Sequence, residues 1–280
     1  MNLMFVGAFN WKSTNFSQRH ALQKCGINVV SYAYRDKQML YGKEKRDNDL
    51  IETCKRERPD VVLISKGNGI NVRVIIEINK ISKTILWYMD AMNNWNKELE
   101  EKIKYCNIIL CEKTSVIEKA LEINSNVFHI IDGFDPECHF PIEIKQDINV
   151  SFIGTLYGNR KKMIPGNAVI ISNAFRKAHS EYVSRSKINL NFCTMNTASN
   201  RIYKILASKG FLLSDDWDYR KEIFKYEADL VIFKDKIDLL EKICYYLQHE
   251  NERNTIAENG YKTVQKFSKD NWAKSVLEHL

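Results

Sequence analysis

The sequence is short of features that would point to several other classes of protein. It has no run of 18 apolar residues, so no transmembrane helix is expected. The N-terminal segment, residues 1–13, lacks the basic stretch of a signal peptide and is expected to begin with a strand. Its seven cysteines are scattered without C-x-x-C spacing, which predicts reduced thiols in the cytoplasm, with no disulfide frame and no zinc site.

Acidic residues are scarce in one window of the chain. Residues 160–209 contain ten basic residues and one acidic residue, so this window has a net charge of +9. The whole chain has a net charge of +7, so the residues outside the window sum to −2. Such an excess predicts an anionic partner: the phosphates of a nucleotide, a nucleic acid or an anionic membrane. A basic face that only aids solubility is the alternative. No helix-turn-helix, RNA-recognition or zinc signature supports the nucleic-acid interpretation.

Short apolar segments alternate with amphipathic ones along the 280 residues, 44% of which are hydrophobic. This alternation predicts two doubly wound, Rossmann-like α/β domains that face a cleft. We expect the first domain over 1–142 and the second over 143–280, with the terminal helix packing back on the first domain. Residues 36–47 are expected to form a polar connector and residues 219–226 a short helix.

The stretch 182–216 forms the clearest single unit. A strand at 188–192, a polar loop at 194–200, a helix that begins at Arg201 and a strand at 211–214 make one βαβ unit. Because helix N-termini bind anions, this loop is a candidate phosphate site. Arg201 opposes the dipole of its own helix, which suggests a task such as binding phosphate; a solvated surface arginine is the equal alternative.

Ligands of open α/β sheets bind beyond the carboxyl ends of the strands. Asp90 follows the expected strand 84–88 and is the candidate general base for a hydroxyl group; a helix-capping or turn aspartate is the alternative. His20 and His129 are further candidate bases, although each is expected to be structural. Trp11, in the loop after the first strand, could stack on a sugar or a base.

Several segments together resemble glycosyltransferases of the GT-B fold, in particular the spore-maturation (CgeB-like) group within the group 1-like family. These segments are GFDPECHFP (133–141), NVSFIGTLYGNR (149–160), NRIYKILASKGFLLSD (200–215) and LLEKICYYLQHENERNTIAENGY (239–261). The resemblance implies transfer of a sugar from a nucleotide-sugar donor, such as a UDP-sugar, to an acceptor held by the first domain.

The resemblance also implies site residues. The phosphate-binding glycine loop matches Gly154 and Thr155, followed by Arg160, and an acceptor loop matches Gly7, Trp11 and Ser13. No Asp-x-Asp pair is placed to hold Mg²⁺, so no metal and no other cofactor is expected. The remaining donor-binding candidates are Asn196, Thr197, Ser199, Asn200, Arg201 and Lys204.

The sequence departs from the family at two donor positions and in length. Lys204 stands where the family has a glutamate that holds the ribose hydroxyls, and Asn196 stands where related enzymes have another glutamate; an ammonium group accepts no hydrogen bond. The second domain is also shorter than expected. Three alternatives stay open: a glycosyltransferase acting on hydroxylated bases in DNA, a non-catalytic nucleotide-binding protein, and peripheral contact with a membrane.

Overall fold

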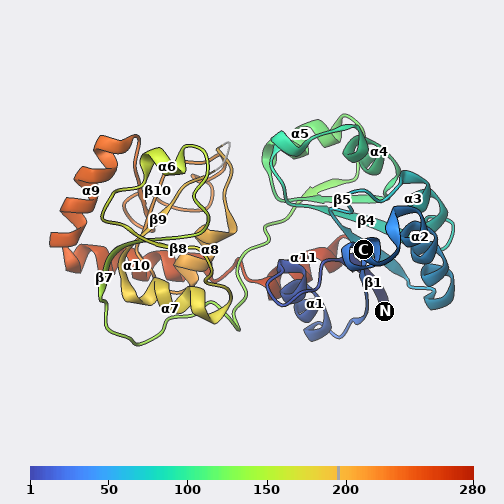
Figure 1. Cartoon of the computed structure of the whole chain (residues 1–280), viewed down its shortest axis with the longest axis horizontal. Helices are drawn as coiled ribbons and strands as arrows, with labels where there is room; N and C mark the ends of the chain where they lie inside the picture. Colours follow the sequence, from blue (N-terminus) through green and yellow to red (C-terminus); the bar gives the residue numbers. More distant parts are fainter. Residues whose placement is uncertain (194–195) are drawn as a thin grey trace. The chain divides into compact units, whose positions relative to one another are not determined.

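The computed structural model describes residues 1–193 and 196–280, and these residues form two α/β units (Figure 1). The first unit contains residues 1–132 and 269–280, and the second contains residues 133–268. The chain thus leaves the first unit at Asp132, earlier than the expected boundary at residue 142. The reason is that Phe134 and Cys138 are buried, and the Ser180 hydroxyl donates to the Cys138 carbonyl oxygen within the second unit.

Six parallel strands form the sheet of the first unit, in the order β2-β1-β3-β4-β5-β6. Helices cover both faces of such a sheet, so its central strands are buried throughout, as all five residues of β3 are. The strand order reverses between β1 and β3, which makes the loops after these strands the topological switch point. The elements are β1 (Asn2–Gly7), α1 (Thr14–Lys24), β2 (Asn28–Ala33), α2 (Tyr34–Glu57), β3 (Val61–Ser65), α3 (Val72–Ile78), β4 (Lys83–Tyr88), η1 (Met92–Asn94), α4 (Lys97–Tyr105), β5 (Ile108–Cys111), α5 (Thr114–Leu121), β6 (Val127–His129) and α11 (Lys269–Glu278).

Five parallel strands form the sheet of the second unit, in the order β11-β10-β9-β7-β8. Its switch point lies between β7 and β9, and the doubly wound arrangement predicted for both halves is confirmed. The module between β7 and β8 is trimmed, because its helix α6 has only four residues. The elements are β7 (Ile148–Ile153), α6 (Arg160–Met163), β8 (Val169–Ile171), α7 (Lys177–Arg185), β9 (Ser186–Asn191), α8 (Asn200–Ala207), β10 (Leu212–Ser214), β11 (Val231–Ile232), α9 (Lys236–Gln248) and α10 (Glu250–Val264).

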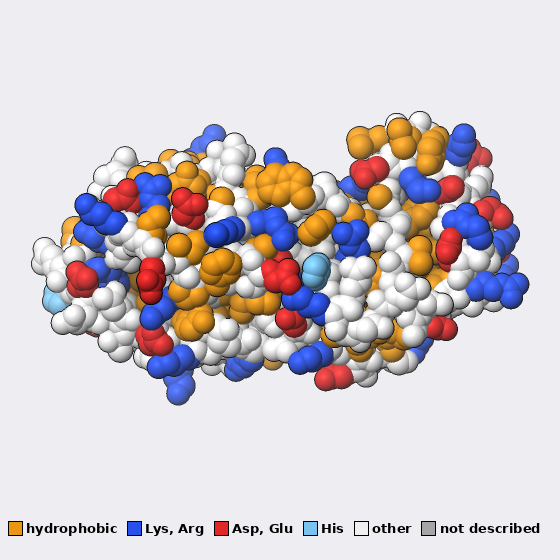
Figure 2. All heavy atoms as spheres, turned by 90° about the horizontal axis from the view of Figure 1, so that it is seen from below, with side chains coloured by type: hydrophobic (Ala, Val, Ile, Leu, Met, Phe, Trp, Pro, Cys, Tyr) orange, Lys and Arg blue, Asp and Glu red, His pale blue; other side chains and the backbone are white. Residues whose placement is uncertain are grey.

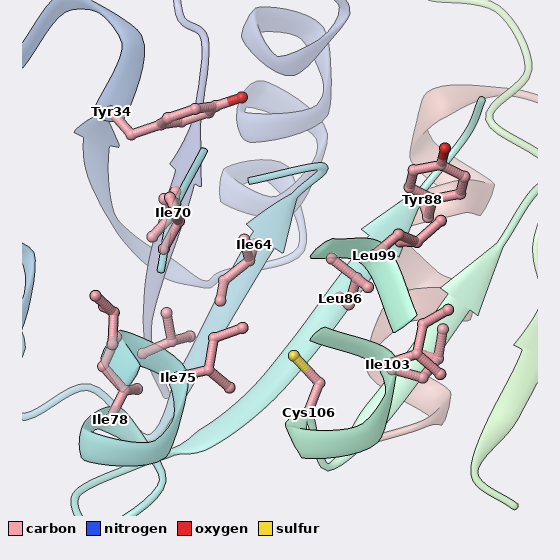
Figure 3. Packing of buried hydrophobic residues seen from close by; sticks show 14 of the residues in the cluster. Tyr34, Ile64, Ile70, Ile75, Ile78, Leu86, Tyr88, Leu99, Ile103 and Cys106 are labelled. Atoms are coloured by element: carbon pink, nitrogen blue, oxygen red, sulfur yellow. The ribbon is translucent and has the colours of Figure 1, made fainter. Parts of the chain in front are cut away.

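Branched aliphatic side chains fill the layer between the first sheet and helices α3 and α4. Ile64 and Leu86 of the sheet lie in one cluster with Ile75 of α3 and Ile103 of α4, and all four side chains are fully buried (Figure 3). Each such side chain contributes about 1.5–3 kcal/mol when it leaves water. This packing holds β3 and β4 side by side, and therefore fixes the loops that follow them.

Residues 36–47 are helical, so the expected polar connector is wrong. They belong to the 24-residue helix α2, which is broken only at Gly42, where φ is +81°. The polar composition of this segment was misleading because its buried side chains include a charged one, Arg46. Arg46 donates to the Gly69 carbonyl oxygen at 2.6 Å and to Asp47 Oδ1 at 2.7 Å. Throughout the part of the chain that is described, no helix is both long and apolar enough to cross a membrane.

Residues 219–226 form turns, so the helix expected there is also wrong. Tyr219 has φ +69° and Glu227 has φ +57°, values that a right-handed helix does not allow. The guanidinium of Arg220 holds the turns together, since its Nε donates to Asp216 Oδ1 at 2.5 Å. The sequence has helical spacing here, but this ion pair and the buried Phe224 side chain select a different backbone.

The terminal helix α11 belongs to the first unit, where it packs beside α1 (Figure 1). Its Trp272 ring lies 5.8 Å from the ring of Trp87 in β4, centroid to centroid. At its start, Lys269 Nζ lies 2.5 Å from Asp132 Oδ1 and donates to the Asp132 carbonyl oxygen at 2.9 Å. Both side chains of this ion pair are buried, so the pair joins the segment before Gly133 to the segment after Ser268.

We expect Gly133→Ala to lower the free energy of unfolding by more than about 2 kcal/mol. Gly133 has φ +66°, and an added Cβ would lie 1.8 Å from the backbone carbonyl oxygen of Phe267, which cannot move as a side chain could. Gly26→Ala is the matched control, because Gly26 has φ +78° but nothing within 4 Å of an added Cβ. Urea unfolding of the variants would measure this difference, and an equal effect in both would contradict the prediction.

Candidate functional site

The switch point of the second unit places the glycine loop after β7 beside the carboxyl end of β9. Strand β7 ends at Ile153, and its neighbour β9 ends at Asn191. Gly154 follows β7 with φ +148°, a value that side-chain-bearing residues rarely adopt. An added Cβ would lie 2.5 Å from Arg201 Nη2. Glycine is therefore required here because the guanidinium of Arg201 lies directly against the backbone.

Arg201 is held at the N-terminus of α8 by uncharged partners. Its Nε donates to the Ile153 carbonyl oxygen at 2.5 Å, and its Nη1 donates to Asn191 Oδ1 at 2.8 Å. Its guanidinium also lies 4.7 Å from the centre of the Phe152 ring. Within residues 1–193 and 196–280 it forms no ion pair with a carboxylate. Burial, followed by the positive charge of Arg160, lowers the pKa of Arg201 to about 10, so the group stays charged at neutral pH.

Arg160 lies close to Arg201 and is buried. Its Nη1 donates to the Thr155 carbonyl oxygen at 3.3 Å, and its Nη2 donates to the Phe192 carbonyl oxygen at 3.1 Å. It packs over the Tyr157 ring at 4.1 Å. The structure thus brings together three predicted donor residues, Gly154, Arg160 and Arg201, at one switch point. Two like charges at close range are costly unless an anion lies between or beside them.

Asn191 holds this arrangement and was not predicted from the sequence. Its Oδ1 accepts from Arg201 Nη1 and from the Ser199 hydroxyl, each at 2.8 Å, and its Nδ2 donates to the Ser214 hydroxyl at 2.9 Å. Because the Ser199 hydroxyl is directed to Asn191, the Ser199 side chain makes no capping hydrogen bond to α8. The sequence offers one signal for Asn191, which is an asparagine at the end of a strand expected to be buried.

The other predicted donor residues lie in the same loop and helix. Asn200 opens α8, Lys204 lies one turn further on and is half-buried, and Thr197 is half-buried in the loop. Asn196 has φ +54°, and its carbonyl oxygen accepts from the Asp218 amide at 2.7 Å. The expected polar loop began at Thr194, which lies outside the described residues.

Asp215 is a second residue that sequence reasoning missed. It follows β10, and its Oδ1 accepts from the Cys193 backbone amide at 2.7 Å. Burial raises the pKa of this carboxyl group. The carboxylate thereby anchors the end of the segment that leads from β9 into the polar loop.

In the first unit, Asp90 lies in the loop that follows β4, as expected. Its Oδ1 forms an ion pair with Lys66 Nζ at 2.5 Å, and both side chains are about one quarter exposed. Lys66 follows β3 and has φ +61°, so two neighbouring strands deliver the pair. A partly exposed carboxylate at the end of a strand is placed where it could accept a proton from a hydroxyl group.

The three predicted acceptor residues lie at the end of β1 and in the loop that follows it, but none of them lines the pocket that contains Asp90. Ser13 caps α1, where its hydroxyl accepts from the Asn15 amide at 3.2 Å. An added Cβ on Gly7 would lie 2.8 Å from Asn15 Oδ1. Trp11 is 56% exposed and lies under the Lys12 ammonium group at 5.3 Å. Helix capping thus explains why Ser13 is present, and close packing explains Gly7, so neither residue needs a ligand to account for it.

A larger pocket, of about 1120 Å³, lies at the opposite end of the same sheet. Its lining includes Pro59, Lys83 and Asn107, which precede or begin β3, β4 and β5. The amino ends of parallel strands are not where open α/β sheets bind ligands. The smaller pocket that contains Asp90 lies at the carboxyl ends of β3 and β4.

The basic window 160–209 does not form a continuous basic surface. Arg160 is buried, and several other members pair with acids outside the window. Figure 2 shows basic and acidic side chains interspersed over one face of the molecule. This pairing weakens the nucleic-acid interpretation, which needs unpaired cations along a backbone. The ion pairs are Arg176 with Asp135 at 3.9 Å, Arg185 with Asp147 at 2.7 Å and Lys209 with Glu258 at 2.6 Å.

His179 of α7 makes the second unit sensitive to acid. Its side chain is buried, and neither ring nitrogen has a hydrogen-bond partner among the described residues. Burial, followed by the charges of Lys204 and Arg201, lowers the pKa of His179 well below its usual value. The unfolded chain, with a histidine pKa of about 6.5, therefore binds a proton before the folded chain does.

We expect the free energy of unfolding to be highest above about pH 6.5 and to fall as the pH decreases below it, by at most about 1.4 kcal/mol per pH unit from this group. Substitution by a neutral apolar residue, His179→Leu, should make this dependence shallower. Unfolding midpoints measured between pH 8 and pH 5 would show it. An identical pH dependence in the wild type and in His179→Leu would contradict the prediction.

Residues 140–278 match the protein family described as glycosyl transferase-like. A DNA ligase of Borreliella afzelii is 22% identical over an alignment of 247 residues, and the match covers 73% of this chain. The chain spans only 36% of the length of that ligase. The family match includes all the predicted donor residues, from Gly154 to Lys204.

Solved structures match both units together. HepE of Anabaena, in complex with UDP-glucose, is 9% identical with a TM-score of 0.71, and the match covers 100% of both chains. Sucrose-phosphate synthase of Thermosynechococcus elongatus is 9% identical with a TM-score of 0.72 over 99% of this chain and 98% of that one. A glycosyltransferase of Rickettsia africae is 10% identical with a TM-score of 0.67 over 99% and 97%. The chain thus has the GT-B fold of glycosyltransferases.

Proposed function

We propose that this protein is a glycosyltransferase that moves a hexose from a nucleoside-diphosphate sugar, specifically a UDP-sugar, to an acceptor hydroxyl group without a metal ion. The observation that carries the proposal is the position of Arg201. A half-buried guanidinium with no carboxylate partner in the described chain lies at a helix N-terminus, at the switch point of a doubly wound sheet. The family match over residues 140–278 and the UDP-glucose complex of HepE support the same conclusion.

The second unit would hold the donor through its diphosphate. Arg201, the first backbone amides of α8 and the nearby Arg160 supply positive potential, and a charged hydrogen bond to phosphate contributes about 1.5–3 kcal/mol. The same groups would stabilise the leaving group, whose negative charge grows as the bond from the sugar to the phosphate oxygen breaks. We propose that these cations take the place that a divalent metal ion holds in other transferases.

The first unit would supply the acceptor and its base. In the proposed step the acceptor oxygen forms a bond to the anomeric carbon, and the bond from that carbon to the diphosphate breaks. The departing diphosphate keeps the electron pair, and the proton of the hydroxyl group passes to the Asp90 carboxylate. The ion pair with Lys66 holds the Asp90 carboxylate in place at the end of β4.

The finer assignments are part of this proposal. The motifs of the second half favour the spore-maturation (CgeB-like) group among GT-B enzymes, and the seven free cysteines favour a cytoplasmic location. Lys204 cannot accept hydrogen bonds from ribose hydroxyls, so we propose that it lies toward the phosphates. An acceptor in DNA is not favoured, because residues 1–145 carry a charge of only +2 (21 basic and 19 acidic residues).

A screen of nucleotides by thermal shift tests the donor assignment. UDP, GDP, ADP, CDP and dTDP would be compared, with and without EDTA. A ligand present at about 100 times its dissociation constant adds about 2.7 kcal/mol to the free energy of unfolding, which is easily detected. We expect UDP to stabilise the protein most, with no effect of EDTA. The absence of any shift would overturn the proposal, and UDP binding without hydrolysis of any UDP-sugar would favour a non-catalytic nucleotide-binding protein.

A further inference from the structure

A pocket of about 470 Å³ lies wholly within the first unit, at the carboxyl ends of β3 and β4. One wall is the loop that contains Lys66 and Asn68, and the other is the loop that runs from Asp90 to Asn96. Tyr88, the last residue of β4, and Leu99 of α4 lie side by side at the top of the hydrophobic core and form part of the lining (Figure 3). The pocket is therefore a concave site on a rigid base.

The charges that line this pocket cancel. Lys66 pairs with Asp90, and Lys102 pairs with Glu98 and donates to the Gly67 carbonyl oxygen. The lining thus holds two cations and two anions, each cation with a carboxylate beside it. A phosphate or a nucleic acid would find no unpaired cation here, and a cationic ligand would find no unpaired carboxylate.

The pocket is also lined by asparagine side chains that have no hydrogen-bond partner among the described residues. The side chains of Asn68, Asn93 and Asn94 make no hydrogen bond to any residue in 1–193 or 196–280. Each amide offers donors and an acceptor, and Asp90 Oδ2 is a further acceptor with no partner in the same residues. Hydroxyl groups both donate and accept, so groups of this kind match a ligand that carries several hydroxyls.

Trp95 adds an aromatic wall that is fixed in place. Its Nε1 donates to Glu100 Oε1 at 2.6 Å, and the Lys119 ammonium group lies 4.6 Å from the centre of the ring. The ring is half-buried against the core of the first unit. An aromatic face beside amides and a carboxylate offers both apolar contact and hydrogen bonds to a sugar ring.

We propose that this pocket binds a neutral carbohydrate and that this carbohydrate is the acceptor of the transferred sugar. Its role as acceptor rests on the function proposed above. The loop of Gly7, Trp11 and Ser13 is then not the main acceptor site. Asn93 and Asn94 select the acceptor by hydrogen bonds to its hydroxyl groups, and Asp90 Oδ2 receives the hydroxyl that reacts.

Binding measured separately for sugars and for UDP tests this inference. Saturation-transfer NMR would be recorded with the methyl glycosides of glucose, galactose and N-acetylglucosamine, with maltose and lactose, and with glycerol 3-phosphate and oligo-dT as anionic probes. Each sugar would be used at about 10 mM, which fills a site whose dissociation constant is about 1 mM. The double variant Asn93→Ala/Asn94→Ala removes two exposed amides from the pocket, and Asn254→Ala removes one exposed amide from α10 as the control.

We expect at least one neutral sugar to bind, and the double variant to weaken this binding at least about tenfold while the UDP affinity and the unfolding midpoint stay unchanged. Asn254→Ala should behave as the wild type does. UDP binding without binding of any sugar, preference for an anionic probe, or sugar binding that is unchanged in the double variant would overturn the inference. Sugar binding that depends on Asn93 and Asn94, in a protein that does not bind UDP, would overturn the proposed function but support the assignment of the pocket.

Discussion

Arg201→Ala is expected to raise the dissociation constant for UDP about 10- to 150-fold, which corresponds to about 1.5–3 kcal/mol. The guanidinium is already fixed by Ile153 and Asn191, so little conformational entropy is lost when phosphate binds. It is also partly desolvated, which strengthens its attraction to an anion. Isothermal titration of UDP into the wild type and the variant would measure the change.

Two further variants make this experiment specific. Arg201→Lys keeps the positive charge but loses the fork that bonds both Ile153 and Asn191, so it should bind UDP with intermediate affinity. Lys161→Ala removes an exposed charge from α6, next to Arg160, and should leave the UDP affinity nearly unchanged. The unfolding midpoint of each variant would be measured in parallel, because Arg201→Ala leaves the Ile153 carbonyl oxygen without its donor. UDP affinity equal to wild type in folded Arg201→Ala would remove Arg201 from the donor site.

Asp90→Asn is expected to reduce kcat about 10²- to 10⁴-fold while the dissociation constant for UDP stays the same. The asparagine side chain has the same shape as aspartate, but it cannot take the proton of the acceptor hydroxyl, and general base catalysis contributes about this factor. Asp90 lies in the first unit, whereas the predicted donor residues lie in the second. Single-turnover transfer from a UDP-sugar, with UDP binding measured in parallel, would separate the two effects.

The control for this experiment is Asp36→Asn, which removes a carboxylate from an exposed position in α2 of the same unit. It should transfer sugar at the wild-type rate. A wild-type rate in Asp90→Asn would show that Asp90 is not the base. A loss of UDP affinity in Asp90→Asn would indicate instead that the substitution disturbs the fold.

Most of the secondary structure could be predicted because the strands are short, apolar and separated by amphipathic segments. The bounds of β9 and β10 agree with the expected bounds within two residues, and α8 begins one residue before the expected Arg201. The two errors have a common cause. In each segment, residues 36–47 and residues 219–226, a charged side chain, Arg46 or Arg220, is buried. Hydrogen bonds to polar partners hold it there, so the spacing of the apolar residues does not reveal the backbone conformation.

The candidate site was predicted in part. The structure places Gly154, Arg160 and Arg201 together. Arg201 was a candidate because of its position at a helix start, and Gly154 and Arg160 were candidates because of the resemblance to GT-B enzymes. Asn191 and Asp215 were missed, because their roles depend on neighbours in other elements. The pocket at Asp90 was likewise visible only as a single aspartate, since Lys66 and Asn94 reach it from the two loops that follow neighbouring strands.

The alternation of strands and helices, the two α/β halves and the positions of the loops after the strands could be read from the sequence, because side-chain polarity and local backbone preference act over a few residues. Which of these loops lie next to each other depends on the tertiary structure. The order of strands places β7 beside β9 and thereby brings Arg201 against Gly154, and it places β3 beside β4 and thereby pairs Lys66 with Asp90. Strand order results from packing across the whole sheet, and no local pattern of residues encodes it.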